Sequence, residues 1–429
     1  MIAVPILVAT YVLVMVDRFD RSILALLGGG AMILAGVLTQ DQAIRGIDFN
    51  TIGLLTGMMV LVAISRRSGV FEFLAVWSAQ AVRASPVGLL ATLAVVTAVL
   101  SALLDNVTTV LLIAPVTISI TRRLGVAPFP FLLAEVMASN FGGTATLIGD
   151  PPNILIGSAA GLTFNDFIVH LLPVVVVVMA AQVATLHMAW GRGLGSTAAA
   201  RAAVMALRPA DSITDRRLLR HAVAVFALVL LGFATARLTG LEPGSIALIG
   251  AAALMLLENL AHPRDEQFEK ISATYAEVDW ITIFFFIGLF IVVAGVEKSG
   301  ALSWLAGEVT RATRGNLMLT VFAVLWVSAI ASAIIDNIPF VAAMIPVIHA
   351  MAPDFGGEHA ILPLWLALSL GACFGGNGTL IGASANLTVS GIAQREGIGF
   401  GFAAYTRRAL PLTLLSVAIA QAYLYLRYL

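Results

Sequence analysis

The sequence predicts an all-α polytopic membrane protein made of two inverted-topology repeats, with about ten transmembrane passes plus two re-entrant hairpins and discontinuous helices. Of its 429 residues, 60% are hydrophobic and only 11% are charged, whereas soluble domains carry about 25% charged residues. Long apolar stretches recur along the chain, and several blocks of sequence occur twice in the same order. Lipid must therefore surround most of the molecule.

Continuous apolar stretches mark most of the passes. A spanning helix needs about 20 mostly apolar residues, and eight stretches approach or exceed that length: 2–16, 22–38, 51–65, 166–190, 222–237, 243–258, 278–296 and 403–426. The first has no basic start and no small-residue cleavage site, so we expect a retained helix. Four further stretches are interrupted, two at the pairs Asp105-Asn106 and Asp336-Asn337 and two at Gly-rich runs after Asn140 and Cys373.

The two halves of the chain share motifs in the same order. The run Ser101-Ala-Leu-Leu-Asp-Asn106 recurs as Ser332-Ala-Ile-Ile-Asp-Asn337, 231 residues later. A Gly-rich run from Phe141 recurs from Phe374, 233 residues later. We therefore expect an N-terminal repeat over 1–190, an Arg-rich cytoplasmic linker over 191–220 and a C-terminal repeat over 221–429.

Charge distribution predicts the orientation. If each Asp-Asn stretch is a hairpin that enters and leaves on one side, each half crosses the membrane five times and the second half is inverted. With the linker in the cytoplasm, 18 of the 24 basic residues, Arg21 among them, lie inside and 6 lie outside, as the positive-inside rule requires. Both termini are then outside. An excess of Arg over Lys is typical of GC-rich bacteria, so we expect a bacterial cytoplasmic membrane.

Composition excludes several other classes of protein. A net charge of zero gives no electrostatic basis for nucleic-acid binding. A single cysteine excludes a disulfide framework, a Cys-rich zinc site and an iron–sulfur cluster. The chain has no HExxH, GxSxG or phosphate-loop motif. We therefore expect no enzyme activity, no metal site and no cofactor.

Polar and Gly-rich interruptions give the candidate site. Inverted repeats with broken helices are typical of secondary transporters, and non-helical backbone at membrane depth must be buried in protein or line a cavity. Close helix packing is the alternative role for Gly and Thr. The predicted substrate-binding residues lie at the two Asp-Asn pairs and the two Gly-rich breaks: Asp105, Asn106, Asn140, Gly142, Gly143, Thr144, Thr146, Asn153, Asp336, Asn337, Gly375, Gly376, Asn377, Thr379 and Asn386.

Four acids are candidates for proton coupling. Asp105 and Asp336 occupy matched positions, and an Asp at the bilayer centre costs about 2.5–3.5 kcal/mol; the alternative is that each caps the following helix. Asp150 has no acidic counterpart in the second repeat and belongs either to coupling or to a turn. Glu135 likewise has no acidic counterpart and is either a proton site or a structural acid. Cys373 is expected to be a small buried hydrophobe.

At these motifs the chain resembles the ArsB/NhaD-type arm of the ion-transporter superfamily, most closely the arsenite/antimonite efflux permeases and the P-protein-like branch. The resemblance rests on Leu104-Asp-Asn-Val-Thr-Thr109, on the run Asn140 to Asn153 with its Gly-Asp-Pro-Pro-Asn ending, and on their second-half copies. It implies that two hairpin tips and two unwound helices meet at one midplane site. It also implies a homodimer. Some arsenite permeases of the family work with a soluble ATPase subunit, and the sequence leaves open whether this chain does.

Arsenite and antimonite are neutral trihydroxides at neutral pH, so they need hydrogen-bond donors and acceptors rather than a counter-charge. The resemblance and this polar set together predict export of arsenite and antimonite in exchange for protons. The alternatives are a sodium/proton antiporter and an inorganic-anion permease of the same superfamily. In the sodium/proton antiporter the same acids would alternate between Na⁺ and H⁺.

Overall fold

The computed structural model describes residues 2–16, 18–260 and 262–429, and within those parts it contains helices and no strand. Nine helices of the described chain are long and apolar enough to cross a membrane. They are α4 (Phe49–Arg66), α6 (Pro86–Leu103), α7 (Asn106–Leu124), α10 (Phe164–Trp190), α12 (Arg216–Ala234), α16 (Trp280–Lys298), α18 (Leu317–Ile334), α19 (Asn337–Met351, continued by the short helix η2 over Ala352–Phe355) and α22 (Phe402–Tyr428).

Shorter helices complete the bundle. Within the apolar part these are α1 (Ala3–Val16), α2 (Arg21–Leu34), α5 (Val70–Ala81), α8 (Phe129–Thr144), α9 (Pro151–Ala160), α14 (Pro243–Asn259), α17 (Ala301–Ala312), α20 (Leu362–Gly375) and α21 (Ser384–Arg395). Connecting segments hold α3 (Gln40–Arg45), α11 (Ala198–Met205), η1 (Pro209–Ser212), α13 (Ala236–Thr239) and α15 (Arg264–Ala276), whereas η3 (Gly376–Gly378) lies at the buried Gly-rich break after α20. The all-α polytopic fold predicted from the sequence is confirmed.

Some element boundaries differ from the prediction. The second apolar stretch is helical only to Leu34, because Gly36 adopts a left-handed φ of +70° and such a residue commonly ends a helix. Helices α5 and α17 were not anticipated. Each begins directly after a left-handed glycine, Gly69 or Gly300. Each glycine follows a serine, and the Ser-Gly pair occurs at 68–69 and again at 299–300. The linker, expected to be a simple loop, contains α11 and η1.

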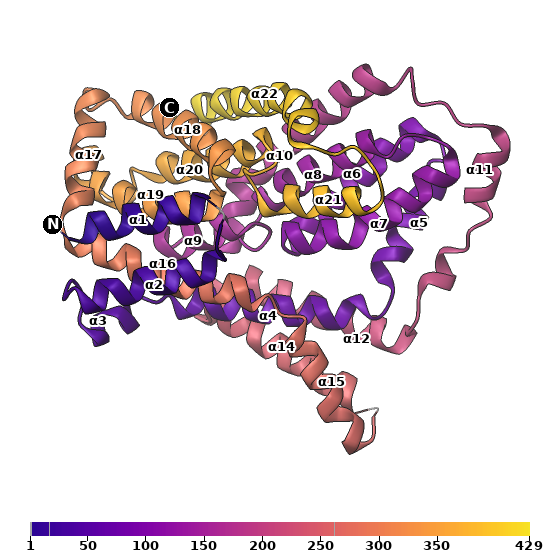
Figure 1. Cartoon of the computed structure of the whole chain (residues 1–429), viewed down its shortest axis with the longest axis horizontal. Helices are drawn as coiled ribbons and strands as arrows, with labels where there is room; N and C mark the ends of the chain where they lie inside the picture. The colour runs from indigo at the N-terminus through magenta and orange to yellow at the C-terminus, as the bar shows by residue number, and fades with distance from the viewer. Residues whose placement is uncertain (1, 17, 261) are drawn as a thin grey trace.

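The repeats are inverted and packed into one another. Hairpin 1, formed by α6 and α7, comes from the end of the molecule that carries α5 and α11, whereas hairpin 2, formed by α18 and α19, comes from the opposite end beside α17 (Figure 1). Helix α2 packs on α16, and its counterpart α14 packs on α4 in the same way. A methyl group added at Gly57 would lie 2.6 Å from the carbonyl carbon of Ala247, and one at Gly288 would lie 2.3 Å from that of Ala25. These paired contacts relate the two halves by a two-fold axis.

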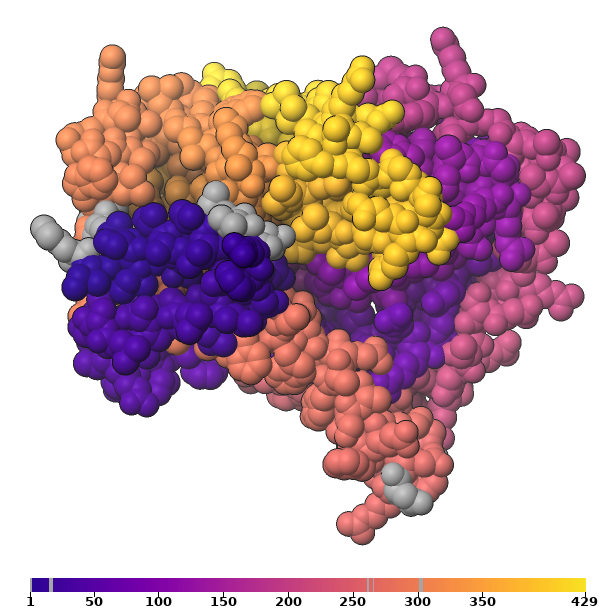
Figure 2. Space-filling view, in the orientation of Figure 1, coloured from indigo at the N-terminus to yellow at the C-terminus, as the bar shows by residue number. Residues whose placement is uncertain are grey.

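The surface view separates the ends of the chain from its middle. The N-terminal helices form one lobe beside the segment that contains hairpin 2, and the C-terminal helix lies above the middle of the molecule (Figure 2). Helix α15 projects away from the bundle at one corner (Figures 1 and 2). The termini are therefore at the periphery, while both hairpin tips point to the centre.

Both hairpins turn within two residues. Leu104 and Asp105 join α6 to α7, and Ile335 and Asp336 join α18 to α19. The Asp105 carboxylate accepts a hydrogen bond from the backbone N–H of Thr108 at 2.7 Å. Asp336 accepts one from the backbone N–H of Ile338 at 3.1 Å. Each aspartate therefore caps the second helix of its hairpin, which satisfies donors that lipid could not.

Candidate functional site

Four buried asparagines connect the two repeats at the centre. Asn106 Nδ2, at the tip of hairpin 1, donates to Asn140 Oδ1 at 3.0 Å. Asn140 Nδ2 donates to Asn377 Oδ1 at 2.8 Å and to Asn386 Oδ1 at 3.0 Å, across the repeat boundary. All four are at most 4% exposed. The predicted convergence of a hairpin tip and both broken helices is thus present in the structure.

The amides of Asn153 and Asn386 support the broken backbone. Asn153 Nδ2 donates to the carbonyl oxygens of Thr144 at 3.1 Å and Thr146 at 3.0 Å. Asn386 Nδ2 donates at 2.8 Å to each of the Gly376 and Thr379 carbonyl oxygens. A break in a membrane helix exposes carbonyls that need donors. Both side chains, predicted to bind substrate, therefore have a structural task of their own.

The threonines at the breaks hold them to the hairpins. Thr146 Oγ1 donates to Ala102 O at 2.5 Å, and Thr379 Oγ1 donates to Ala333 O at 2.6 Å. Both carbonyls lie in the last turn before a hairpin tip. Thr144 Oγ1 donates to Asn140 O within its own helix at 2.7 Å. All three hydroxyls thus position backbone.

The glycines at the breaks allow backbones to touch. A methyl group at Gly142 would lie 2.1 Å from Ala98 O, and one at Gly375 would lie 2.3 Å from Ala329 O. The same holds within each break, where a methyl group at Gly143 would be 2.5 Å from Gly149 O and one at Gly376 would be 2.8 Å from Gly382 O. These contacts correspond to the close-packing alternative. A role in solute contact stays a prediction.

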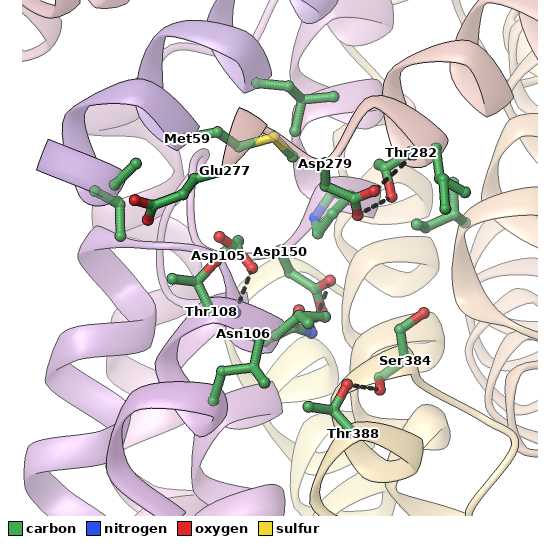
Figure 3. A pocket seen from close by; sticks show the side chains of 18 of the residues that line it. Met59, Asp105, Asn106, Thr108, Asp150, Glu277, Asp279, Thr282, Ser384 and Thr388 are labelled. Atoms are coloured by element: carbon green, nitrogen blue, oxygen red, sulfur yellow. Dashed lines mark hydrogen bonds between the residues drawn. The ribbon is translucent and has the colours of Figure 1, made fainter. Parts of the chain in front are cut away.

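A cavity of about 400 Å³ adjoins the tip of hairpin 1. Figure 3 shows Asp105, Asn106 and Asp150 on one side of it, facing Glu277 and Asp279 near the start of α16. Its other polar lining residues are Arg21, Arg66, Thr108, Thr282, Asn337, Ser384 and Thr388. Four carboxylates therefore share this cavity with two guanidinium groups. Asp279 and Glu277 were not predicted, because no repeated motif marks them as site residues.

Asp150 is the least satisfied of these acids. It is fully buried. Its Oδ1 accepts a hydrogen bond from Asn106 Nδ2 at 3.3 Å, and its Oδ2 has no partner among the described residues. An unpaired buried carboxylate oxygen is costly. Such an atom beside a cavity is therefore a candidate for binding a proton or a solute.

Asp336 has a partner that the sequence analysis missed. Arg21 Nη1 lies 3.1 Å from Asp336 Oδ2 and also 3.1 Å from Ser384 Oγ, while Nη2 donates to Thr282 Oγ1 at 3.1 Å. The charge distribution predicts only that Arg21 lies on the cytoplasmic side, whereas the structure places its guanidinium group against the tip of hairpin 2. The available signal was an arginine at the very start of an apolar stretch.

The remaining candidates differ in their position relative to the cavity. Glu135 is buried in α8, accepts a hydrogen bond from the Thr117 hydroxyl, and does not line the cavity. Asn337 lines the cavity with its Nδ2 unpartnered among the described residues. Cys373 is buried, with its Sγ 3.8 Å from Asn153 Oδ1. Within the described chain, no group of three or more His, Cys, Asp or Glu side chains is placed to hold a metal ion.

Comparison with known proteins identifies the class. The chain is 44% identical over 431 residues to an uncharacterized transporter of Mycobacterium tuberculosis, a match covering 100% of this chain and 98% of that protein. It is 33% identical over 504 residues to the P protein of Sus scrofa, covering 99% of this chain and 59% of the P protein. The crystal structure of the YdaH transporter of Alcanivorax borkumensis has the same fold, with a TM-score of 0.64 over 90% of this chain and 86% of that one, at 16% identity.

A family model described as citrate transporter matches residues 11–371. The predicted class of multi-pass membrane transporter is thus confirmed, and the family and the relatives are transporters rather than enzymes. The arsenite-specific branch stays a prediction. By sequence and by the extent of this match, the chain belongs to the citrate transporter family of membrane transporters.

Proposed function

We propose that this transporter exchanges protons for a small neutral hydroxylated solute, arsenite or antimonite, at the cavity beside hairpin 1. The observation that carries this proposal is the buried Asp150 carboxylate, whose Oδ2 has no described partner. Asn106 joins it to the asparagines that connect both repeats. A trihydroxide can donate to this carboxylate and accept from the Asn337 amide, whose Nδ2 has no partner among the described residues.

Coupling to protons follows from the charges in the cavity. Asp105 and Asp150 line it without an arginine partner, whereas Asp336 is paired with Arg21. Glu135 does not line it. Of the four predicted proton sites, we therefore assign coupling to Asp105 and Asp150, which would release protons when the solute's hydroxyl groups bind.

Citrate is the second candidate, because the family is described by that substrate. Four carboxylates and two arginines line the cavity, so a free citrate anion meets more negative than positive charge. Citrate would then need an accompanying cation or protons. A sodium/proton antiporter would use the same acids with Na⁺ alone.

Purified protein in liposomes with an imposed pH gradient separates these candidates. Internal pH is followed with a dye while arsenite, antimonite, citrate with or without Mg²⁺, or Na⁺ is added in turn. We expect proton flux with arsenite and antimonite, and none with Na⁺ alone. Flux with citrate only, or with Na⁺ only, would overturn the metalloid proposal and assign the cavity to that substrate. Glu269→Gln, on exposed α15, is the control.

We also propose that the linker faces the cytoplasm of a bacterium, that both termini are outside, and that residues 1–190, 191–220 and 221–429 are the functional units. The backbone N–H of Thr214, in the linker, donates to the carbonyl oxygen of Ser68 at 3.1 Å. Ser68 is two residues from Arg66, which lines the cavity. The cavity is therefore near the linker side, where an exported solute would load. Because Cys373 is buried, a cysteine at Ser196 or Arg314 is the one readily accessible thiol. An impermeant maleimide added to intact cells should label only the Arg314→Cys variant; labelling of Ser196→Cys alone would reverse the orientation.

Two partners remain part of the proposal. A homodimer and a soluble ATPase subunit follow from the resemblance to arsenite permeases. Cross-linking in native membranes tests the first. Transport by the purified chain without ATP would show that the second is dispensable.

A further inference from the structure

A second cavity of about 870 Å³ lies on the outside of hairpin 1, between α6 and α10. We call it the α6–α10 groove. Its walls are mostly Val, Ala and Leu, and its floor reaches Gly142 and Ala145 at the break after α8. Val99 and Val176 on its walls are 55% and 58% exposed. It shares no lining residue with the cavity beside Asp150.

The second repeat fills the equivalent space with side chains. Helix α18 follows α6 by 231 residues, and α22 follows α10 by 238, a register shared by Pro173 and Pro411. The groove residues Gly88, Ala91 and Val95 correspond in α18 to Leu319, Phe322 and Trp326. The α6 wall of the groove therefore lacks three large side chains that α18 carries at the corresponding positions.

A hydrogen bond joins the two helices that border the equivalent space in the second repeat. Trp326 Nε1 donates to Gln421 Oε1 at 2.6 Å and so links α18 to α22. The corresponding residues of the first repeat are Val95 and Val183, and both line the groove. No residue of the described chain takes their place there. Between two apolar helices within the membrane, the material that fills such an apolar volume is hydrocarbon.

Two arginines lie near one end of the groove. Val87, near the start of α6, and His187, near the end of α10, both line it, so these helix ends lie together. Arg83 precedes α6 and Arg192 follows α10. Both are exposed, and neither makes an ion pair with a residue of the described chain. This arrangement suits the phosphate of a lipid headgroup.

We propose that the α6–α10 groove binds one phospholipid, with an acyl chain between α6 and α10 and the phosphate beside Arg83 and Arg192. The lipid supplies to the first repeat the packing that Trp326 and Gln421 supply to the second. Because α6 leads to the tip that carries Asp105, the bound lipid supports the hairpin of the solute cavity. This inference does not depend on which solute is transported.

Photo-labelling tests it. The full-length transporter is reconstituted in vesicles that contain a phosphatidylglycerol with a diazirine in its acyl chain, and labelled peptides are identified by mass spectrometry. We expect concentrated labelling of α6 and α10 in the wild type. In the variant Ala91→Phe with Val95→Trp, it should fall to the level of α12, whose Leu228 is 66% exposed on the surface of the molecule. The converse variant Trp326→Val should gain label on α22.

Two results would overturn the proposal. One is unchanged labelling of α10 in the filled variant; the other is a cross-link from the wild-type groove to a second copy of the chain, which would make it a subunit interface. Arg83→Gln with Arg192→Gln tests the phosphate: we expect native mass spectrometry to show loss of the retained anionic phospholipid, and full retention would refute that half. A single symmetric elution peak shows that each variant is folded.

Discussion

The two hairpin tips carry the same Asp-Asn pair, yet their surroundings differ. Asp336 is tied to Arg21 of α2, and Ser384 of α21 donates to its Oδ2 at 3.0 Å. Asp105 has no basic partner among the described residues and lines the cavity near Asp150. The two tips have the same Asp-Asn pair, and residues that differ between the two repeats make their surroundings unequal.

Those residues can be identified from the repeat register. Ala25 and Ala247 occupy matched positions in α2 and α14, so the counterpart of Arg21 is Pro243. The counterpart of Asp150 is Ala383. The first repeat therefore has an acid, Asp150, that the second repeat lacks. The hairpin acid of the second repeat, Asp336, has a basic partner, Arg21, that the hairpin acid of the first repeat lacks. We expect the tips to respond differently to mutation.

The largest effect is expected at Asp150. Asp150→Asn removes the buried charge while keeping shape, so metalloid-driven proton flux in liposomes should fall to background. Asp336→Asn should retain part of the flux, since Arg21 already compensates that charge. Equal loss in both variants would show that the tips are functionally equivalent after all.

The next effect concerns Arg21. Arg21→Gln leaves Asp336 without its ion pair, and breaking a buried pair costs about 3–5 kcal/mol. Since Arg21 and Asp336 side chains are 26% and 20% exposed, we expect a smaller loss of about 1–3 kcal/mol in unfolding free energy. Combining Arg21→Gln with Asp336→Asn should recover part of it.

Denaturant unfolding in detergent measures this coupling. Additive losses in the double variant would mean that the 3.1 Å contact carries no energy. Arg45→Gln, which removes the exposed ion pair with Asp41, is the control and should cost about 0–1 kcal/mol.

A symmetric pair of substitutions sharpens the comparison. Gly142→Ala and Gly375→Ala would each place a methyl group against a hairpin carbonyl, at 2.1 Å and 2.3 Å. Overpacking of this kind costs typically about 1–3 kcal/mol, so both should lower the unfolding temperature by similar amounts. A loss in only one variant would show that the hairpins are held with different rigidity. Gly391→Ala, with open space around it, is the control.

The sequence was sufficient for the repeats and the hairpins, because each is encoded in a motif that occurs twice. The convergence that the structure shows at Asn106, Asn140, Asn377 and Asn386 was implied by the resemblance that those motifs carry. The sequence could not show that the Asn153 and Asn386 side-chain amides donate hydrogen bonds to backbone carbonyl oxygens. That assignment depends on which carbonyls each break leaves free, and motif spacing does not contain this information.

Arg21 and Asp279 were missed for a related reason. Both lie at the start of a helix, where charged side chains are common and do not mark a functional site. Their importance comes from how α2 and α16 pack against hairpin 2 and the cavity, which brings together residues 315 positions apart in the case of Arg21 and Asp336. Contacts of this range between unrepeated residues leave no local pattern.

The smallest effect is expected at Ser384, whose hydroxyl contacts both members of the Arg21–Asp336 ion pair. Ser384→Ala removes the hydroxyl that contacts both Arg21 Nη1 at 3.1 Å and Asp336 Oδ2 at 3.0 Å, at a cost of about 0.5–1.5 kcal/mol. The counterpart in the first repeat is Pro151, which has no hydroxyl. If the serine acts only through the ion pair, Ser384→Ala should have no further effect in the Arg21→Gln, Asp336→Asn background. An undiminished effect there would mean that Ser384 supports α21 by another route, and the second tip would then be anchored by more than its arginine.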